Sequence, residues 1–200
     1  MLNLDDLDGE LLLDLAYASI ADALGLAAPA PRSGPKPTWL REPGASFVTL
    51  EFGEQLHGCI GTIEPHRPLG VDVERNALAA AFEDPRSRPL RPDELARVDL
   101  SVAVLGPLTP MRFTDERDAR AQLRPGIDGV LLTWRGYRGV FLPKVWDKLP
   151  TPGEFLDQLK RKAGLGVDFW APELALERYE VRSFTRLHDQ VPVWARGPTP

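Results

Sequence analysis

The chain has 200 residues, of which 43% are hydrophobic and 26% are charged, and its formal net charge is −5. This length suffices for one large domain or for two small ones that share a core. The negative balance argues against nucleic-acid binders and proteins of anionic membrane surfaces, which usually carry a basic surface. The single cysteine cannot form an internal disulfide, and we see neither a signal-peptide pattern nor an apolar run of roughly 18 residues. We therefore expect a cytoplasmic protein.

The N-terminal half predicts two helices and a β-hairpin. Asp8 suits the N-cap of the first helix, and Gly25 suits its end. Gly53 and Glu54 would form the hairpin turn, and Pro68 suits the start of the second helix. In chain order we expect a helix over residues 8 to 25, a proline-rich extended arm over 27 to 37, strands over 46 to 52 and 55 to 60, and a helix over 68 to 82.

The C-terminal half predicts four further strands, a short helix and a strongly specified helix. Thr151 and Glu154 form a capping box with Pro152 between them, and Gly164 ends that helix. We expect a strand over residues 98 to 105, a short helix near 115 to 123, a hairpin from strands over 129 to 134 and 138 to 142, the capped helix over 151 to 164, and a strand over 176 to 184. Hairpins separated by single helices predict an α+β fold, with a mostly antiparallel sheet flanked by helices.

The stretch from Gln55 to Thr62 carries the strongest chemical signal. Cys59 lies between Gly58 and Gly61, and glycines suit a backbone that turns or that another group approaches closely. A protonated His57 or His66 would favour the thiolate of Cys59, and because side chains alternate along a strand we expect His57 and Cys59 on the same face. The alternative is a small apolar residue packed below a tight loop. We favour this alternative because most free cysteines behave in this way.

Other chemistry near this stretch is less well supported. His57, Cys59 and His66 offer ligand types that zinc accepts, but their spacing matches no recognised metal motif, and we predict no metal site. Glu64, Asp72 and Glu74 could serve in acid–base chemistry, yet the place of Asp72 and Glu74 near the start of a predicted helix explains these two as charges that favour the helix dipole. The phosphate-loop ending Gly-Lys-Ser/Thr is missing.

Four blocks of the sequence resemble, in order, the AMMECR domain family. These blocks are Leu56 to Thr62, Asn76 to Arg86, Phe141 to Val145 and Lys162 to Leu165. The resemblance covers roughly residues 8 to 185, and the chain is similar to the A component of the AmmeMemoRadiSam group, which also contains a Memo-like protein and a radical SAM protein. It implies an α+β fold with a larger and a smaller lobe. We expect a single domain over residues 1 to 185, followed by a proline-rich and loosely packed tail over 186 to 200.

The resemblance also directs attention to specific residues. The candidate catalytic residues are Cys59 and His57, and the candidate ligand-binding residues are Gly58, Gly61, Thr62, Arg86 and Lys144. Two positions depart from the family pattern, because the family usually has arginine where this chain has His57 and commonly an aromatic residue where it has Ser87. Exchanging a guanidinium for a titratable ring puts an anion-binding role at that position in doubt.

Arg86 and Lys144 each have two interpretations. Arg86 would hold a carboxylate or phosphate near Cys59, or it would form a pair with Asp84 that is either superficial or braces the loop. Lys144 follows a predicted strand and would project into a cleft, or it would be solvated like most lysines.

We derive two functional hypotheses. The first is an enzyme or enzyme component of an AmmeMemoRadiSam-type system that acts on a small molecule or a modified peptide at a site centred on Cys59. The second is a non-catalytic adaptor that docks a Memo-like or radical SAM partner and uses the glycine-rich stretch as structural support. No cofactor can be named from the sequence.

Overall fold

In the computed structural model, residues 3–27 and 36–190 are described, and they form two compact units. The first unit includes the chain up to Leu105 and again from Arg182, and the second runs from Gly106 to Val181. The predicted arm over 27 to 37 and the predicted tail over 186 to 200 fall mostly outside the described residues. The domain boundary at residue 185 stays a prediction.

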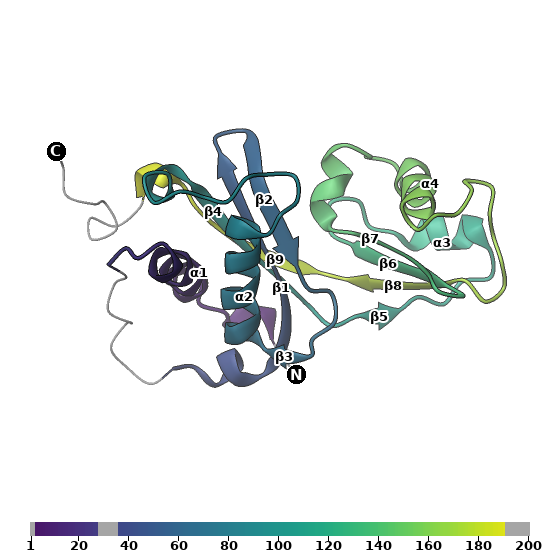
Figure 1. The fold of residues 1–200 in the computed structure, drawn as a ribbon. Helices are drawn as coiled ribbons and strands as arrows, with labels where there is room; N and C mark the ends of the chain where they lie inside the picture. Colours follow the sequence, from purple (N-terminus) through teal and green to yellow (C-terminus); the bar gives the residue numbers. More distant parts are fainter. Residues whose placement is uncertain (1–2, 28–35, 191–200) are drawn as a thin grey trace. The chain divides into compact units, whose positions relative to one another are not determined.

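The first unit is built on a five-stranded antiparallel sheet with the order β2-β1-β4-β9, in which the short β3 also pairs with β1 (Figure 1). Its strands are β1 (Pro43–Phe52), β2 (Gln55–Gly61), β3 (Arg67–Pro68), β4 (Asp99–Leu105) and β9 (Val181–Arg186). Gly53 turns the chain between β1 and β2 with a φ of 60°, a conformation that glycine adopts at little steric cost. The predicted hairpin is therefore confirmed.

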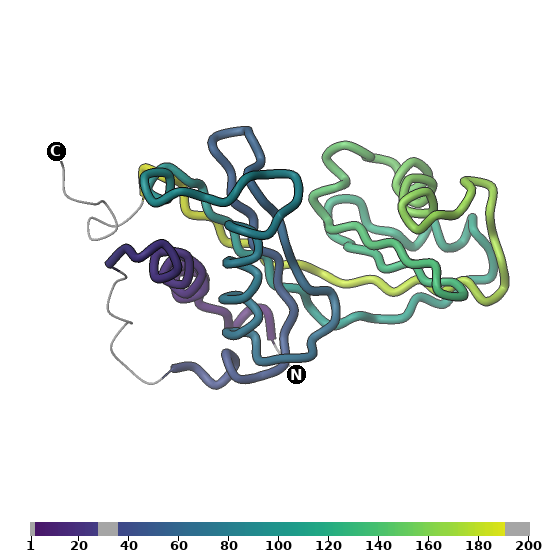
Figure 2. The backbone as a smooth tube through the Cα atoms, viewed as in Figure 1, coloured from purple at the N-terminus to yellow at the C-terminus, as the bar shows by residue number. Residues whose placement is uncertain are grey.

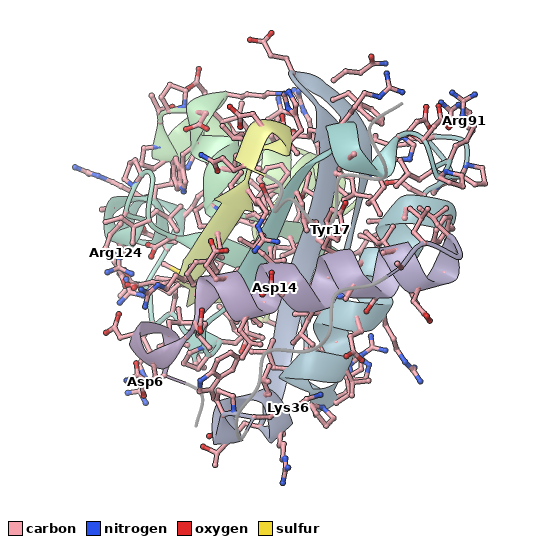
Figure 3. All side chains as sticks on the ribbon, turned by 90° about the vertical axis from the view of Figure 1, so that its left-hand side faces the viewer. Asp6, Asp14, Tyr17, Lys36, Arg91 and Arg124 are labelled. Carbon is pink, nitrogen blue, oxygen red and sulfur yellow. The ribbon has the colours of Figure 1, made fainter. Side chains whose placement is uncertain are left out.

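Two helices, α1 (Gly9–Ala23) and α2 (Leu69–Phe82), pack with this sheet (Figure 1). Asp8 caps α1 as predicted, because its carboxylate accepts a hydrogen bond from the N–H of Leu11 at 3.1 Å. Asp14 lies on α1 (Figure 3), and it accepts a hydrogen bond from Arg186, the last residue of β9, at 2.8 Å. The core between helices and sheet includes Val48 and Leu50, both completely buried. Short 3-10 helices are η1 (Leu4–Asp6), η2 (Thr38–Arg41), η3 (Leu95–Arg97) and η5 (His188–Gln190).

The second unit has its own antiparallel sheet, with the order β5-β8-β6-β7 (Figure 1). It contains β5 (Thr109–Pro110), α3 (Glu116–Gln122), β6 (Gly129–Trp134), β7 (Tyr137–Phe141), η4 (Pro143–Asp147), α4 (Pro152–Lys162) and β8 (Ala175–Tyr179). The capping box of α4 forms as predicted, since the N–H of Glu154 donates to Thr151 Oγ1 at 3.2 Å. The fully buried Phe155 stacks on Trp146 with the ring centres 3.8 Å apart, which anchors α4 in a separate core.

The predicted α+β fold with mostly antiparallel sheets is confirmed. One element is corrected: the strand expected over residues 176 to 184 is two strands, β8 and β9, which belong to different sheets and are interrupted at Glu180. At this point the chain leaves the second unit, and the C=O of Glu180 accepts a hydrogen bond from the N–H of Gly106 at 2.8 Å. The segment entering the second unit and the segment leaving it are therefore adjacent (Figure 2). Within the described residues, no helix combines the length and apolar character that crossing a membrane requires.

Candidate functional site

The stretch around Cys59 forms β2, an edge strand of the first sheet, and its glycines are required by close packing. A Cβ atom on Gly58 would lie 2.0 Å from the backbone oxygen of Ala80 in α2, and one on Gly61 would lie 2.2 Å from the ring of Phe47. The helix therefore packs directly on the backbone of β2. The predicted reason for the glycines, close approach of another group, is confirmed, and for Gly58 that group is a helix of the protein itself.

Asp84 and Arg86 brace the free edge of β2. The N–H of Cys59 donates to Asp84 Oδ2 at 2.8 Å, and Arg86 Nη2 donates to the C=O of Cys59 at 3.1 Å. Since β1 pairs with only one edge of β2, these two side chains satisfy backbone groups that another strand would otherwise bind. Arg86 Nε also donates to Asp84 Oδ1 at 2.9 Å. The hydrogen bonds from Arg86 and from the Cys59 N–H hold the pKa of the Asp84 carboxyl far below its usual range.

This geometry supports the bracing interpretation of Arg86. The Asp84 side chain is 1% exposed, whereas that of Arg86 is 57% exposed, so the guanidinium holds the buried carboxylate and still faces solvent. Its predicted role in binding a ligand stays a prediction.

The Cys59 thiol is partly buried and meets a hydroxyl group. Thr49 Oγ1, on the paired strand β1, donates a hydrogen bond to Cys59 Sγ at 3.3 Å. Thr49 is paired on its other side with Ser101 of β4, whose hydroxyl lies 2.9 Å from that of Thr185 in β9. Small polar side chains thus cross this face of the sheet, opposite the face on which Gly58 meets α2.

The expectation that His57 and Cys59 share a face is wrong, and a β-bulge is the reason. Gly58 pairs with Leu50 and Leu56 pairs with the next residue of β1, so His57 is an extra residue in β2 and the alternation is broken there. The His57 ring packs edge-on against Phe52, 5.5 Å between ring centres, on the core side of the sheet. The Cys59 thiol points to the opposite side, toward Thr49.

The other histidine near Cys59 in sequence, His66, is exposed, and its Nδ1 lies 2.8 Å from the backbone oxygen of Glu64. Across residues 3–27 and 36–190, no group of three His, Cys, Asp or Glu side chains is arranged to hold a metal ion. The three ligands considered from the sequence are therefore not assembled.

Thr62 belongs to a buried polar network that sequence reasoning missed. Its hydroxyl donates to Asp72 Oδ1 at 2.6 Å. Asp72, fully buried in the first turn of α2, also accepts from the N–H and hydroxyl of Ser46, from Asn76 Nδ2 and from Arg67 Nε, at 2.7–2.9 Å. A buried carboxylate with this many donors ties the helix to the sheet. The position of Asp72 at the start of a helix explains only why a negative charge is present. The sequence does not reveal the network, because the groups that donate to Asp72 come from distant segments.

Lys144 is exposed and lies in η4 of the second unit, whereas Cys59, His57, Arg86 and the glycines lie in the first. Its membership of a common site stays a prediction.

A pocket in the first unit was not predicted. It has a volume of about 450 Å³ and is lined by Phe52, Gln55, Leu56, His57, Ser87, Arg88, Glu94 and Arg97. The lining contains His57 and Ser87, the two positions at which we expect the sequence to depart from the family pattern. No sequence signal indicates the pocket, because its charged residues follow α2 in an irregular segment without periodicity.

Together, the sheet topology, the braced edge strand and the buried network define an α+β protein of two units with a glycine-rich edge strand at its candidate site. Residues 13–184 match the AMMECR1 family, and the chain belongs to this family. It is 37% identical over 154 residues to a protein of Methanothermobacter thermautotrophicus, with 74% of this chain and 78% of the relative covered. It is 34% identical over 206 residues to a protein of Thermococcus gammatolerans, with coverages of 96% and 97%.

The fold is similar to that of a solved structure, an uncharacterised protein from Pyrococcus horikoshii. The TM-score is 0.78 at 28% sequence identity, and the match covers 89% of this chain and 91% of the other. The resemblance inferred from four sequence blocks is therefore confirmed.

Proposed function

We propose that this AMMECR1-family protein is a non-catalytic binding module that docks a Memo-like or radical SAM protein. The position of His57 carries this proposal. The base expected to activate the thiol lies on the opposite face of the sheet from Cys59. The backbone of Cys59 is held by Asp84 and Arg86, which is the arrangement expected of structural support.

Titration of the full chain with each purified partner, followed by calorimetry, tests the docking proposal. We expect saturable binding to one of them, and we expect a folded Cys59→Ala variant to bind with unchanged affinity because its thiol is not needed. Absence of binding to both partners would contradict the proposal. Loss of binding in a folded Cys59→Ala variant would instead indicate that the thiol takes part in the function.

A reactive Cys59 is the second candidate, and one contact favours it. The Thr49 hydroxyl donates to Sγ at 3.3 Å, and a hydrogen bond to sulfur stabilises the thiolate more than the thiol. Arg86, whose guanidinium binds the backbone oxygen of the same residue, adds a nearby positive charge. An enzyme acting on a small molecule or modified peptide would use this thiol as its nucleophile.

The alkylation rate of Cys59 against pH separates the two candidates, because the chain has one thiol to label. If the thiol is activated, the folded protein reacts faster at pH 7 than the denatured protein. Thr49→Val, which keeps the shape and removes the hydroxyl, should then slow the reaction. If Cys59 is structural, the folded protein reacts more slowly than the denatured one and Thr49→Val has no such effect.

A further inference from the structure

The pocket that His57 lines contains a buried polar atom without a partner. His57 is 7% exposed, and its Nε2 has no hydrogen-bond partner among the described residues. Buried polar side-chain atoms nearly always have a partner, and leaving one without costs about 1–3 kcal/mol. An unpartnered imidazole nitrogen on a residue that lines a pocket is available to a molecule that enters the pocket.

The charged residues that line the pocket, Arg88, Arg97 and Glu94, carry a net positive charge. Glu94, 4% exposed, accepts from both terminal nitrogens of Arg88, at 2.8 Å for Nη1. It also accepts at 3.2 Å from Arg91, which lies on the segment after α2 (Figure 3). Hydrogen bonds from Arg88, together with the backbone N–H and the charge of Arg91, lower the pKa of Glu94 to about 2. Glu94 is thus ionised at neutral pH and already matched by arginines.

Arg97 is the lining cation least engaged by these contacts. Its guanidinium lies 3.9 Å from Asp93, beyond hydrogen-bond distance, and both side chains are more than 60% exposed. An exposed pair at this distance contributes little, so Arg97 can bind a second anion at small cost. Arginine presents a planar fork that matches carboxylate and phosphate oxygens.

Two lining residues are apolar. Phe52 packs edge-on against the His57 ring, and Leu56 is 40% exposed although it is a large hydrophobic residue. A ligand that covers both would bury apolar surface, and binding pockets commonly combine apolar walls with a few polar groups that fix orientation.

We propose that this pocket binds a small organic oxyanion, a carboxylate or phosphate monoester with an apolar body. The oxyanion accepts hydrogen bonds from His57 Nε2–H and from Arg97, and the apolar body lies against Phe52 and Leu56. The site is separate from the Cys59 thiol, which faces the other side of the sheet, and it does not depend on the docking function proposed above.

The three histidine rings provide the test. Phenylacetate, phenyl phosphate and inorganic phosphate are each titrated into the full chain while the ring signals are followed by NMR. His66 and His188 are exposed and outside the pocket lining, so they serve as internal controls. We expect a saturating shift of the His57 signals alone, with the first two probes distinguishing a carboxylate from a phosphate ligand. Inorganic phosphate, which lacks the apolar body, should bind at least tenfold more weakly than the better of the two.

Two variants and one control identify the binding groups. His57→Phe keeps a ring against Phe52 and removes the donor, and Arg97→Gln removes the cation. Each should weaken binding at least tenfold, whereas Arg75→Gln, an exposed arginine on α2 outside the pocket, should not change it. Equal, non-saturating shifts of all three histidines, or unchanged affinity in folded His57→Phe, would overturn the proposal.

Discussion

Gly58 shows how a single missing side chain fixes the packing of a helix on an edge strand. A Cβ atom there would lie 2.0 Å from the Ala80 backbone oxygen, and α2 also contributes the buried Asp72 to the network beneath the sheet. The carbonyl cannot move away without displacing a helix that is held at a second point. The glycine is therefore a packing requirement, whatever ligand or partner the site has.

We predict that Gly58→Ala lowers the free energy of unfolding by about 2–4 kcal/mol, because the new methyl group meets backbone rather than a flexible side chain. Urea unfolding measures the change. Gly70→Ala is the matched control in the same unit, since its Cβ would lie at an ordinary 3.4 Å from Leu40 and alanine favours the helix. It should not lower the stability, and the helix preference of alanine should raise it by up to about 1 kcal/mol. Equal effects in both variants would contradict the packing explanation.

The low pKa of Glu94 predicts that the protein loses stability in acid. Its pKa is about 2 in the folded protein against an ordinary value of 4.5, so the folded state binds the proton less readily than the unfolded state. The resulting stabilisation is fully present above pH 4.5 and is lost as the pH falls toward 2. Glu94→Gln should therefore be less stable than the wild type at pH 6 and lose less of its stability between these pH values. Glu54→Gln, in the exposed turn after β1, should follow the wild type throughout.

At the scale of elements, side chains rather than a neighbouring strand bind the backbone at the outer edge of β2. Asp84 and Arg86 satisfy the N–H and C=O of Cys59 from a segment just after α2. This arrangement also occupies one position of the exposed edge that could otherwise pair with another chain. The Asp-Pro-Arg segment thus connects the end of the helix to the strand that the helix covers.

Asp84→Asn should lower the free energy of unfolding by about 1–3 kcal/mol, since an amide cannot accept from both the Cys59 N–H and the Arg86 fork as the carboxylate does. The Cys59 amide should also exchange its hydrogen faster. Asp93→Asn, which removes an exposed carboxylate 3.4 Å from Arg91, should cost less than about 0.5 kcal/mol. Unchanged exchange at Cys59 in Asp84→Asn would show that the brace is not needed.

The elements predicted well are those that local signals specify. The capping box at Thr151 and the turn at Gly53 act within a few residues, and their elements appear where expected. The features that were missed depend on distant segments. The bulge at His57 arises from pairing with β1, and the interruption at Glu180 arises because two sheets share the chain. The Asp72 network joins four segments that no local pattern connects.

At the scale of the whole molecule, the second unit is an insertion with its own core. Its buried apolar residues, among them Phe155 and Trp146, form a cluster separate from the cluster of the first unit. The unit's two chain ends are adjacent, because the N–H of Gly106 donates to the C=O of Glu180. Adjacent chain ends and a separate hydrophobic core are the properties of a unit that folds independently.

We predict that a fragment of residues 106–181 folds alone. It should show a single cooperative thermal transition and dispersed amide signals, with Trp146 protected from solvent by its stack on Phe155. Phe155→Ala in the fragment should abolish the transition or lower its stability by about 3–5 kcal/mol. A fragment that stays unfolded under native conditions would show that the second core needs the first unit.

From the hydrogen bond between Gly106 and Glu180 we infer an order of folding. In the unfolded chain, pairing β4 with β9 requires closure of a loop that contains the entire second unit, at an entropic cost of about 4 kcal/mol for this length. Once the second unit has folded, its ends already lie together and this cost is removed. We therefore expect the sheet of the first unit to remain incomplete during synthesis, and β9 to join its edge last.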